Sequence, residues 1–366
     1  MYFEVSMNTL GGTMYIIRQV NQSNALTSTM DNRAINSSYY TLFVNNTDDQ
    51  IRLNILRANS SQEYTLKVDY RYYTSAEAIT FSSDAYTLGP IDRTSNNLPP
   101  YSTINEFEIF RGSVISQIRL LGTEVDTTIT LTDLDDFIQF ETYSRGIPKS
   151  KHGKEVIVRF ILEDLYNDGV FYTDSMGLEM QRRQLNYRPS WDYEVVEPIA
   201  GNYYPINHGM YLRDQRTTFQ VLNDRSQGGS SFYNGTVEMM IDRRMFHYNK
   251  NAVHEVLNVE NHRGHNHRGL PLLTNHYVRF YDNNETFEVT QTARWKQREI
   301  DMPLVYIFGS VPNTIPSEIE SSMYVNSATY NLRIPDQIKI LVQPQFDGSI
   351  YFRLENILDC SYFPSE

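Results

Sequence analysis

The chain lacks most of the features that mark disulfide-rich, membrane-spanning and nucleic-acid-binding proteins. Its single cysteine, Cys360, excludes an internal disulfide and is typical of a small, buried apolar residue. No apolar run reaches the roughly 18–20 residues that a membrane-spanning helix needs, so no membrane span is predicted. The formal net charge of −12 argues against a phosphate-binding surface, which needs an excess of Lys and Arg. No nucleic-acid partner is therefore predicted.

The amino terminus also lacks the basic and apolar regions of a secretory signal peptide. Asn-x-Ser/Thr sequons, which accept N-glycans in secreted proteins, nevertheless recur along the chain. In a sequence this rich in asparagine several sequons are expected by chance, so they give only weak support for a secretory route. The sequons begin at Asn21, Asn36, Asn45, Asn59, Asn234 and Asn284.

Helical patterns are scarce, whereas strand patterns fill the chain. No long stretch repeats apolar residues with a period of 3.6, and only residues 132–136 could form a short helical turn. The 27 tyrosines and 18 phenylalanines suit strands, and we predict an all-β chain of many short strands. The predicted strands are residues 2–7, 13–20, 39–44, 51–56, 64–73, 107–118, 127–131, 137–143, 170–173, 178–183, 219–222, 236–241, 270–273, 277–281, 287–290, 304–308, 338–342 and 350–354.

The most distinctive stretch is residues 168–244, where short strands alternate with sharp turns. Asn234-Gly235 is a type I′ hairpin signal. Residues 223–231 are polar and contain Gly228-Gly229, whose backbone can reach conformations closed to other residues, so we predict a loop there.

Several motifs of this stretch occur in the same order and at the same spacing in one family. They are Asp174-Ser175-x-Gly177, Met180-Gln181-Arg182-Arg183, Tyr187-Arg188-Pro189-Ser190-Trp191, Glu197-Pro198-x-Ala200-Gly201-Asn202-Tyr203-Tyr204-Pro205, Asp224-Arg225-Ser226-Gln227-Gly228-Gly229-Ser230-Ser231 and Asp242-Arg243-Arg244. By these motifs the chain resembles the C-terminal β-region of family 38 glycoside hydrolases, above all the lysosomal-type α-mannosidases. Weaker similarity extends upstream through Gly153-Lys154-Glu155-Val156 to Ser83-x-Ala85-Tyr86-x-x-x-Pro90.

The resemblance implies a fold and a function. We expect a large supersandwich of the galactose-mutarotase type over residues 1–300, and further strands at residues 301–366 that could start a smaller terminal β-sandwich. The implied activity is the retaining hydrolysis of terminal α-mannose residues of N-glycans, in the lysosome or the secretory pathway. The implied partners are a mannose-containing oligosaccharide and the N-terminal catalytic domain of the same enzyme.

The resemblance assigns the chemistry itself to that N-terminal domain, which would precede this chain. An aspartate nucleophile, an acid–base carboxylate and a zinc ion act there, and the zinc-binding strand of the family begins with His-x-Asp. None of the eight histidines here is followed by x-Asp. We therefore expect a fragment or truncated gene product that holds no catalytic residue, binds no zinc and is inactive alone. The alternative is a free-standing carbohydrate-binding or structural β protein.

Three residues of this chain are expected, by the resemblance, to reach the mannose pocket from the β-region. They are Tyr86 of the Ser-x-Ala-Tyr motif and Arg243 of the Asp-Arg-Arg motif, with Arg244 as the nearby alternative. A guanidinium can donate a fork of hydrogen bonds to sugar hydroxyls or to a carboxylate. The competing interpretation is structural, because Asp224-Arg225 and Asp242-Arg243 could each hold the hairpin as an ion pair.

Other chemistry-bearing groups favour structural interpretations. Five histidines between residues 254 and 276 have no predicted helix or strand to fix them as zinc ligands. Three aspartates at residues 133–136 are too close together in sequence to lie on opposite sides of a glycosidic bond. The glycine pair lacks the Lys-Ser/Thr and the helix of a phosphate loop, and the serines lack a histidine nearby in sequence. These groups are His254, His262, His265, His267 and His276; Asp133, Asp135 and Asp136; Gly228-Gly229; and Ser226, Ser230 and Ser231.

Overall fold

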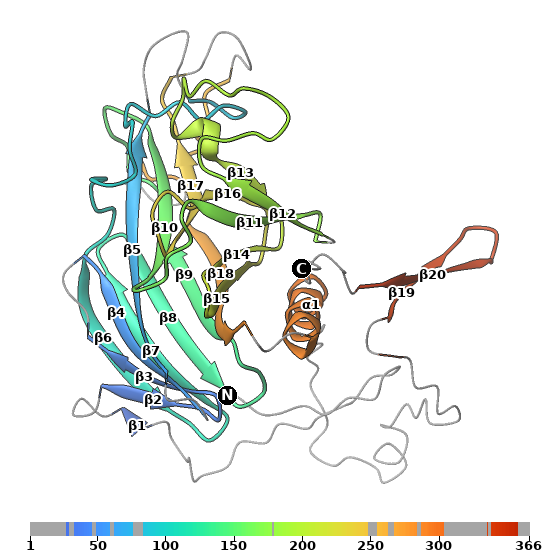
Figure 1. Ribbon diagram of the computed structural model, residues 1–366. Coiled ribbons are helices and arrows are strands. Elements are labelled where there is room, and N and C mark those ends of the chain that lie inside the picture. The colour runs from blue at the N-terminus through green and yellow to red at the C-terminus, as the bar shows by residue number, and fades with distance from the viewer. Residues whose placement is uncertain are drawn as a thin grey trace. The chain divides into compact units, whose positions relative to one another are not determined.

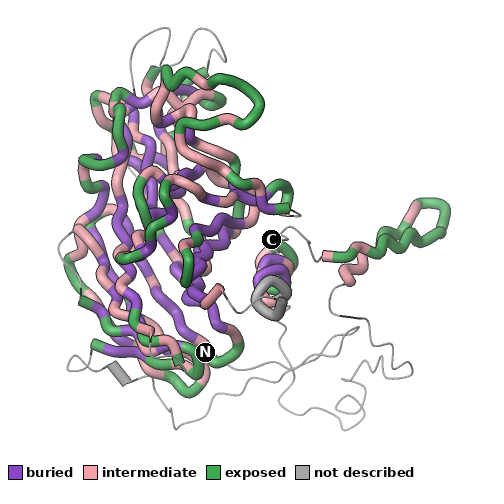
Figure 2. Tube along the Cα trace, viewed as in Figure 1, coloured by how far each residue is buried: buried purple, intermediate pink, exposed green. Residues whose placement is uncertain are grey.

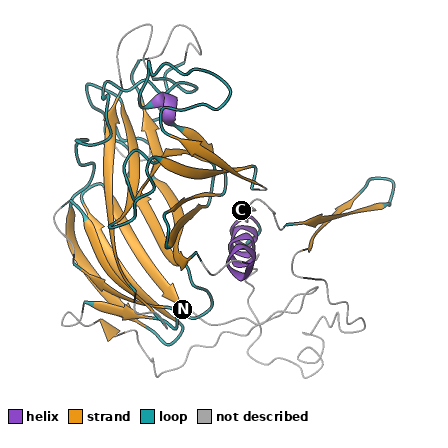
Figure 3. Cartoon of the chain, viewed as in Figure 1, coloured by secondary structure: helices purple, strands orange, loops and turns teal. Residues whose placement is uncertain are grey.

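The computed structural model describes residues 27–28, 33–45, 49–58, 62–75, 83–177, 179–247, 255–262, 267–283, 287–303, 335 and 338–357. The chain forms two compact units, one of residues 27–289 with 359–366, and one of residues 1–26 with 290–358. Antiparallel strands make up nearly all of the described regular structure (Figure 3), which confirms the predicted all-β class.

The first unit contains an eight-stranded sheet with the strand order β13-β16-β17-β10-β5-β4-β3-β2 (Figure 1). Its strands are β2 (Ala34–Asn36), β3 (Tyr40–Val44), β4 (Ile51–Arg57), β5 (Glu63–Thr74), β10 (Lys154–Leu162), β13 (Tyr204–Ile206), β16 (Gln227–Ser230) and β17 (Thr236–Arg244). This order places β10 between two strands that are distant from it in sequence.

A ten-stranded sheet, with the order β1-β6-β7-β8-β9-β18-β15-β14-β11-β12, faces the first. Its strands are β1 (Thr27–Ser28), β6 (Ile104–Arg111), β7 (Ile115–Gly122), β8 (Val125–Thr132), β9 (Ile138–Ser144), β11 (Val170–Ser175), β12 (Glu179–Gln184), β14 (Gly209–Arg213), β15 (Thr217–Asn223) and β18 (Leu272–Asp282). A 3-10 helix, η1 (Ala200–Asn202), precedes β13.

Aromatic contacts between the sheets show that they pack face to face. The ring of Tyr64 on β5 stacks 4.9 Å from that of Phe280 on β18, and Phe140 on β9 meets Phe160 on β10 edge-on at 5.3 Å. Such pairs contribute about 0.5–1.5 kcal/mol each beyond the area that they bury. The apolar side chains that the two sheets bury between them form one continuous hydrophobic core, as expected for a supersandwich. The buried residues are purple in Figure 2.

Strand β10 is buried on both of its faces. Val156, Val158 and Phe160 point into the core between the sheets, whereas Ile157 packs on the opposite, outer face in a second apolar cluster. Residues 88–98 and 199–203 contribute to that cluster, so they cover the outer face of β10 and its neighbours. A strand covered on both sides carries a continuous apolar run instead of an alternating one.

Polar groups buried under this outer layer are paired. Arg159 makes two hydrogen bonds to Asp69, of 2.8 and 2.7 Å. Glu238 accepts hydrogen bonds from the hydroxyls of Tyr73 and Tyr203, each 2.7 Å long, and from Ser95. A buried charge without such partners would be strongly destabilising, so this network fixes how the outer layer sits on the sheet.

The second unit holds all but the first turn of a helix, α1 (Phe287–Asp301), and an antiparallel hairpin of β19 (Ile338–Pro344) and β20 (Ile350–Asn356). The hairpin confirms the strands predicted at residues 338–342 and 350–354. The predicted strand at 287–290 is wrong, because these residues begin α1. Among the described residues, no helix has the length and apolar character needed to cross a membrane.

Other strand predictions differ in detail from the structure. Residues 107–118 lie in two strands, β6 and β7. The predicted strands 270–273 and 277–281 are one strand, β18, which begins at Leu272. Thr132 ends β8, and residues 133–136 form no helical turn, because Thr132 and Asp135 accept hydrogen bonds from nearby backbone amides. The predicted strands 2–7, 13–20 and 304–308 lie outside the described residues.

Candidate functional site

The unit of residues 27–289 has an open cavity of about 580 Å³ where the outer layer meets β16 and β17. It is lined by residues 85–88, by Ala200, Tyr203 and Tyr204, by residues 226–228 and 240–243, and by Leu257. Both Tyr86 and Arg243, which were predicted to reach a sugar, line this one cavity. A site of this size with aromatic walls and a few polar groups is typical of small-ligand pockets.

Arg243 is held in the cavity wall by a buried carboxylate. It stands directly opposite Glu155 in the pairing of β17 with β10. Its Nη2 and Nε lie 2.7 and 3.1 Å from Oε1 of Glu155, and Nη2 also donates to the backbone oxygen of Thr87 at 2.7 Å. Glu155 is fully buried, whereas the Arg243 side chain remains 20% exposed. The guanidinium is therefore anchored at one edge and open to the cavity at the other.

The same carboxylate fixes the segment that carries Tyr86. Oε2 of Glu155 accepts a hydrogen bond of 3.0 Å from Ser83, whose hydroxyl in turn accepts one of 2.8 Å from the amide of Gly89. Residues 83–89 are thus closed into a turn that is tied to β10. Glu155 joins the two predicted sugar-contacting elements, although they are far apart in sequence.

Within this turn Asp84 sets the backbone around Tyr86. Its Oδ1 accepts hydrogen bonds from the amides of Tyr86 and Thr87, at 2.9 and 3.1 Å, as Asp commonly does in tight turns. The Tyr86 side chain is 79% exposed where it lines the cavity. A large aromatic side chain held outward by a fixed turn is well suited to contact a ligand.

A β-bulge at the end of β17 places Asp242 in the cavity wall. Val156 pairs with Asp242 and Ile157 with Met240, so Ile241 is an extra residue on β17. Bulges of this kind redirect side chains at the ends of strands. Burial raises the pKa of Asp242 from its ordinary 3.8 to about 6, against the opposing effects of the Arg243 amide and the Arg244 charge. The cavity therefore contains a carboxyl group that changes charge in mildly acidic solution.

The glycine-rich segment lines the cavity as a strand, so the predicted loop at residues 223–231 is wrong for residues 227–230. A Cβ on Gly229 would lie 2.3 Å from Cδ1 of Ile206 and 2.6 Å from the backbone oxygen of Glu238. On Gly228 it would lie 3.1 Å from the ring of Tyr203. The glycines allow β13, β16 and β17 to pack closely, a structural role.

Gln227, at the start of β16, connects the cavity to a buried histidine. Its Oε1 lies 3.0 Å from Nε2 of His276 on β18. Burial lowers the pKa of His276 from 6.5 to about 4, so the imidazole is neutral near pH 7. His276 therefore acts as a neutral hydrogen-bonding side chain of the core.

The remaining histidine predictions give no metal centre among the described residues, which contain no group of three or more His, Cys, Asp or Glu that could hold a metal ion. His267 is largely exposed and lies 3.3 Å from Oε2 of Glu260. His254 and His265 lie outside the described residues.

Arg244 points away from the cavity and is buried by the segment that follows it. Its side chain is 2% exposed and pairs with Glu260 at 3.0 Å and with Asn258 at 2.7 Å. Its Nη1 donates to the backbone oxygens of Ile147 and His267, each at 2.8 Å. The guanidinium is thus occupied in joining residues 258–267 to the sandwich.

The aspartate, serine and Asp-Arg groups lie in separate places. Asp136 forms an ion pair of 2.7 Å with Arg279. The hydroxyl of Ser230 donates a hydrogen bond of 2.7 Å to the backbone oxygen of Asn202. Asp224 forms an ion pair of 2.9 Å with Arg225. Ser231 donates to the backbone oxygen of Tyr233, and Ser226, which lines the cavity, donates to Asn207. Asp224-Arg225 is thus an ion pair, as the structural interpretation predicted, whereas the guanidinium of Arg243 pairs with Glu155.

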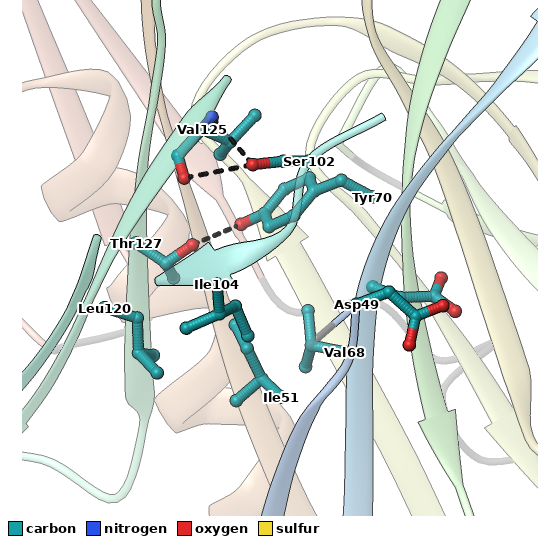
Figure 4. Close-up of a pocket in the computed structure, with 10 residues that line it drawn as sticks. Asp49, Ile51, Val68, Tyr70, Ser102, Ile104, Leu120, Val125 and Thr127 are labelled. Carbon is teal, nitrogen blue, oxygen red and sulfur yellow. Dashed lines mark hydrogen bonds between the residues drawn. The ribbon is translucent and has the colours of Figure 1, made fainter. Parts of the chain in front are cut away.

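A second, enclosed cavity lies between the sheets and holds about 10 Å³ (Figure 4). Beside it Ser102 bonds to the backbone of Val125, and Tyr70 bonds to Thr127 at 2.8 Å. This volume is comparable to that of one water molecule, so the cavity is too small for a sugar.

The chain is similar to known proteins both in sequence and in structure. The family described as glycosyl hydrolases family 38 C-terminal domain matches residues 35–251. A probable alpha-mannosidase of Arabidopsis thaliana is 27% identical over 98% of this chain and 36% of its own length. The alpha-mannosidase of Canavalia ensiformis is 28% identical over 100% of this chain and 37% of its own length. The chain thus spans little more than a third of these relatives.

Two further matches differ in extent. The lysosomal alpha-mannosidase of Bos taurus is 49% identical over 108 residues, which are 30% of this chain and 11% of that protein. The crystal structure of an alpha-mannosidase from Enterococcus faecalis matches 75% of this chain and 32% of that chain, with a TM-score of 0.51 and 12% identity. At this identity the likeness shows a shared fold alone.

Proposed function

This chain belongs to the glycosyl hydrolases family 38 C-terminal domain family, and we propose that it completes the substrate pocket of an α-mannosidase that hydrolyses terminal α-mannose residues of N-glycans. The observation that carries the proposal is that Tyr86 and Arg243 line one open cavity. Glu155 holds both of the segments that bear them.

The free edge of Arg243 has the hydrogen-bonding capacity that a sugar needs. A guanidinium has five N–H donors, and Nε and Nη2 of Arg243 already donate to Glu155 and Thr87. Among the described residues Nη1 makes no hydrogen bond, so we assign it to sugar hydroxyls. Tyr86 offers an aromatic face to the C–H groups of a pyranose. Arg244 is the weaker candidate, because buried partners engage its guanidinium.

The bond-breaking groups are proposed to lie in an N-terminal domain of the same polypeptide, outside this chain. The catalytic zinc of the complete enzyme would also lie there, and no step is assigned to a metal held by this chain. By this proposal the 366 residues bind mannose but do not cleave it alone. Their partners are the catalytic domain and a mannose-containing oligosaccharide.

The lysosomal type and a lysosomal or secretory location belong to the same proposal. They are supported by the short stretch that is 49% identical to the bovine lysosomal enzyme. The division at residue 300, with residues 301–366 starting a terminal β-sandwich, is also a proposal, and the β19–β20 hairpin supports it.

The test is calorimetric binding of methyl α-mannoside to the purified 366-residue chain, together with its hydrolysis of a chromogenic α-mannoside. We expect binding without hydrolysis, and a binding constant that falls at least about tenfold in Arg243→Met, because a charge-assisted hydrogen bond contributes about 1.5–3 kcal/mol. Arg213→Met, at an exposed position of β14, is the matched control and should bind as the unchanged chain does. Equal binding by both variants would contradict the role of Arg243. Hydrolysis by the chain alone would contradict the missing catalytic domain.

A further inference from the structure

An exposed aromatic patch lies on the segment that leads into the cavity wall. Trp191 is 63% exposed and Tyr187 is 50% exposed. The ring of Trp191 lies 5.8 Å from that of Tyr193, with the two planes tilted by 35°. Neighbouring large aromatic side chains that remain exposed commonly mark a binding surface.

Arg188 connects this patch to the cavity. Its guanidinium carbon lies 4.6 Å from the ring centre of Tyr193 and 5.2 Å from that of Tyr204, which lines the cavity. Arg183 stacks on Tyr204 as well, at 4.5 Å. Trp191, Tyr193, Arg188 and Tyr204 therefore form a continuous series of neighbouring aromatic and cationic groups, which we call the aromatic ladder.

Arg188 and Tyr193 are fixed in place before any ligand arrives. Nη1 of Arg188 donates to the backbone oxygen of Tyr187 at 2.8 Å, and Nη2 donates to that of Gly201. The hydroxyl of Tyr193 packs directly on Gly201, where a Cβ would lie 1.9 Å from the oxygen. Arg93 holds the next part of the segment by a 2.6 Å hydrogen bond to the oxygen of Val196. Preorganised side chains of this kind lose little conformational entropy on binding.

We propose that Trp191 and Tyr193 bind a second sugar ring of the oligosaccharide whose terminal mannose occupies the cavity. This inference rests on the proposed function and extends it to an oligosaccharide of at least two rings. A pyranose offers apolar C–H groups on its faces and hydroxyls around its rim. Aromatic rings match the faces, and the indole N–H and the Arg188 guanidinium match the rim.

The arrangement favours a glycan over a protein partner. The ladder continues into the cavity through Tyr204, as consecutive rings of one oligosaccharide would require. Its cationic member, the Arg188 guanidinium, has donors only, and sugar hydroxyls can accept from it without carrying charge. By this proposal one oligosaccharide contacts both the cavity and the ladder.

The experiment compares two ligands, methyl α-mannoside and a linear α-linked mannotriose, in calorimetric titrations of the 366-residue chain. We expect Trp191→Ala to weaken mannotriose binding about 3- to 10-fold and to leave methyl α-mannoside binding unchanged, which is the size expected for one aromatic contact. Tyr166→Ala is the matched control, because Tyr166 is 62% exposed and lies outside the ladder. It should leave both affinities unchanged.

The outcomes separate this inference from the function on which it rests. Unchanged mannotriose binding in Trp191→Ala, with methyl α-mannoside binding still dependent on Arg243, would overturn the second subsite alone. If the unchanged chain binds neither sugar, the cavity function and the subsite both fail. The chain has two tryptophans, so Trp295→Phe leaves Trp191 as the only indole reporter. Its emission should shift with mannotriose and stay constant with methyl α-mannoside, and an equal response to both ligands would also contradict the subsite.

Discussion

Glu155 and Arg243 face each other across the β10–β17 pairing, and their side chains form an ion pair of 2.7 Å at the edge of the cavity. The carboxylate is fully buried, while the guanidinium keeps one edge open. The pair therefore contributes in two ways, by compensating a buried charge and by orienting an arginine toward a ligand. These two contributions can be separated by substitution.

Glu155→Gln should lower the free energy of unfolding by about 2–4 kcal/mol, because it breaks a buried ion pair. Arg243→Met should have a similar cost, since it leaves the Glu155 carboxylate buried without its cation. The double variant should lose about 1–3 kcal/mol less than the sum of the two single losses. Urea unfolding of the four proteins measures this coupling, and strictly additive losses would show that the two side chains do not stabilise each other.

His276 should make stability depend on pH below about 6.5. Its pKa in the folded chain is lowered to about 4, so the unfolded chain binds the proton more readily between these values. Stability should therefore fall as pH falls from 6.5 to 4, by about 3 kcal/mol at most from this group. His276→Asn should flatten this slope in urea unfolding at pH 4.5, 5.5 and 7. A slope identical to that of the unchanged chain would assign the pH dependence to other groups.

Asp242 should change stability with pH in the direction opposite to that of His276. Its folded pKa is raised to about 6, so its contribution is fully present below about 3.8 and is lost as pH rises through 6. Titration of the side-chain carboxyl by carbon NMR should show a midpoint near 6 for Asp242 and should lack this signal in Asp242→Asn. Because Asp242 lines the cavity, sugar affinity should change over the same interval. A midpoint near 4 would mean that the carboxyl is well solvated.

Gly229→Ala should be strongly destabilising. The new methyl group would lie 2.3 Å from Ile206 and 2.6 Å from the backbone oxygen of Glu238, so strands must move apart. We expect a loss of about 1–3 kcal/mol in urea unfolding, the usual range for overpacking. Gly228→Ala is the comparison, because its methyl group would meet only the Tyr203 ring, at 3.1 Å. A smaller loss in Gly229→Ala than in Gly228→Ala would contradict the close strand approach.

Much of the β architecture could be predicted from local sequence, but its central strand could not. Residues Val156 to Phe160 are buried from both sides, and the resulting apolar run has no period-two pattern to distinguish it from a buried helix. Strand β16 was mistaken for a loop, since glycines are rare in strands unless neighbouring backbones approach closely. Helix α1 escaped prediction because two of its buried side chains, Arg294 and Gln297, are polar.

The candidate site could likewise be predicted only in part from the sequence. The motifs identified Tyr86 and Arg243 as candidate sugar contacts. The sequence could not show that Glu155 bonds both to Arg243 and to the turn that carries Tyr86, because local sequence patterns do not determine the register between distant strands. Asp242 was visible only as a neighbour of Arg243, and its raised pKa depends on burial and on a bulge. The aromatic ladder likewise depends on tertiary packing, which brings Tyr193, a residue outside the motifs, between Trp191 and Arg188.

Arg243 is far in sequence from its partners Glu155 and Thr87, and this separation affects how the chain folds during synthesis. The two members of the ion pair are 88 residues apart, and Arg243 is 156 residues from Thr87. During synthesis at about 5–20 residues per second, Glu155 would leave the ribosome roughly 4–18 s before its cation. Strand β10 cannot complete its pairing within that interval, and such non-local pairing folds slowly. The nascent chain would expose an apolar strand edge for seconds, which makes this stretch a natural place for chaperones to bind.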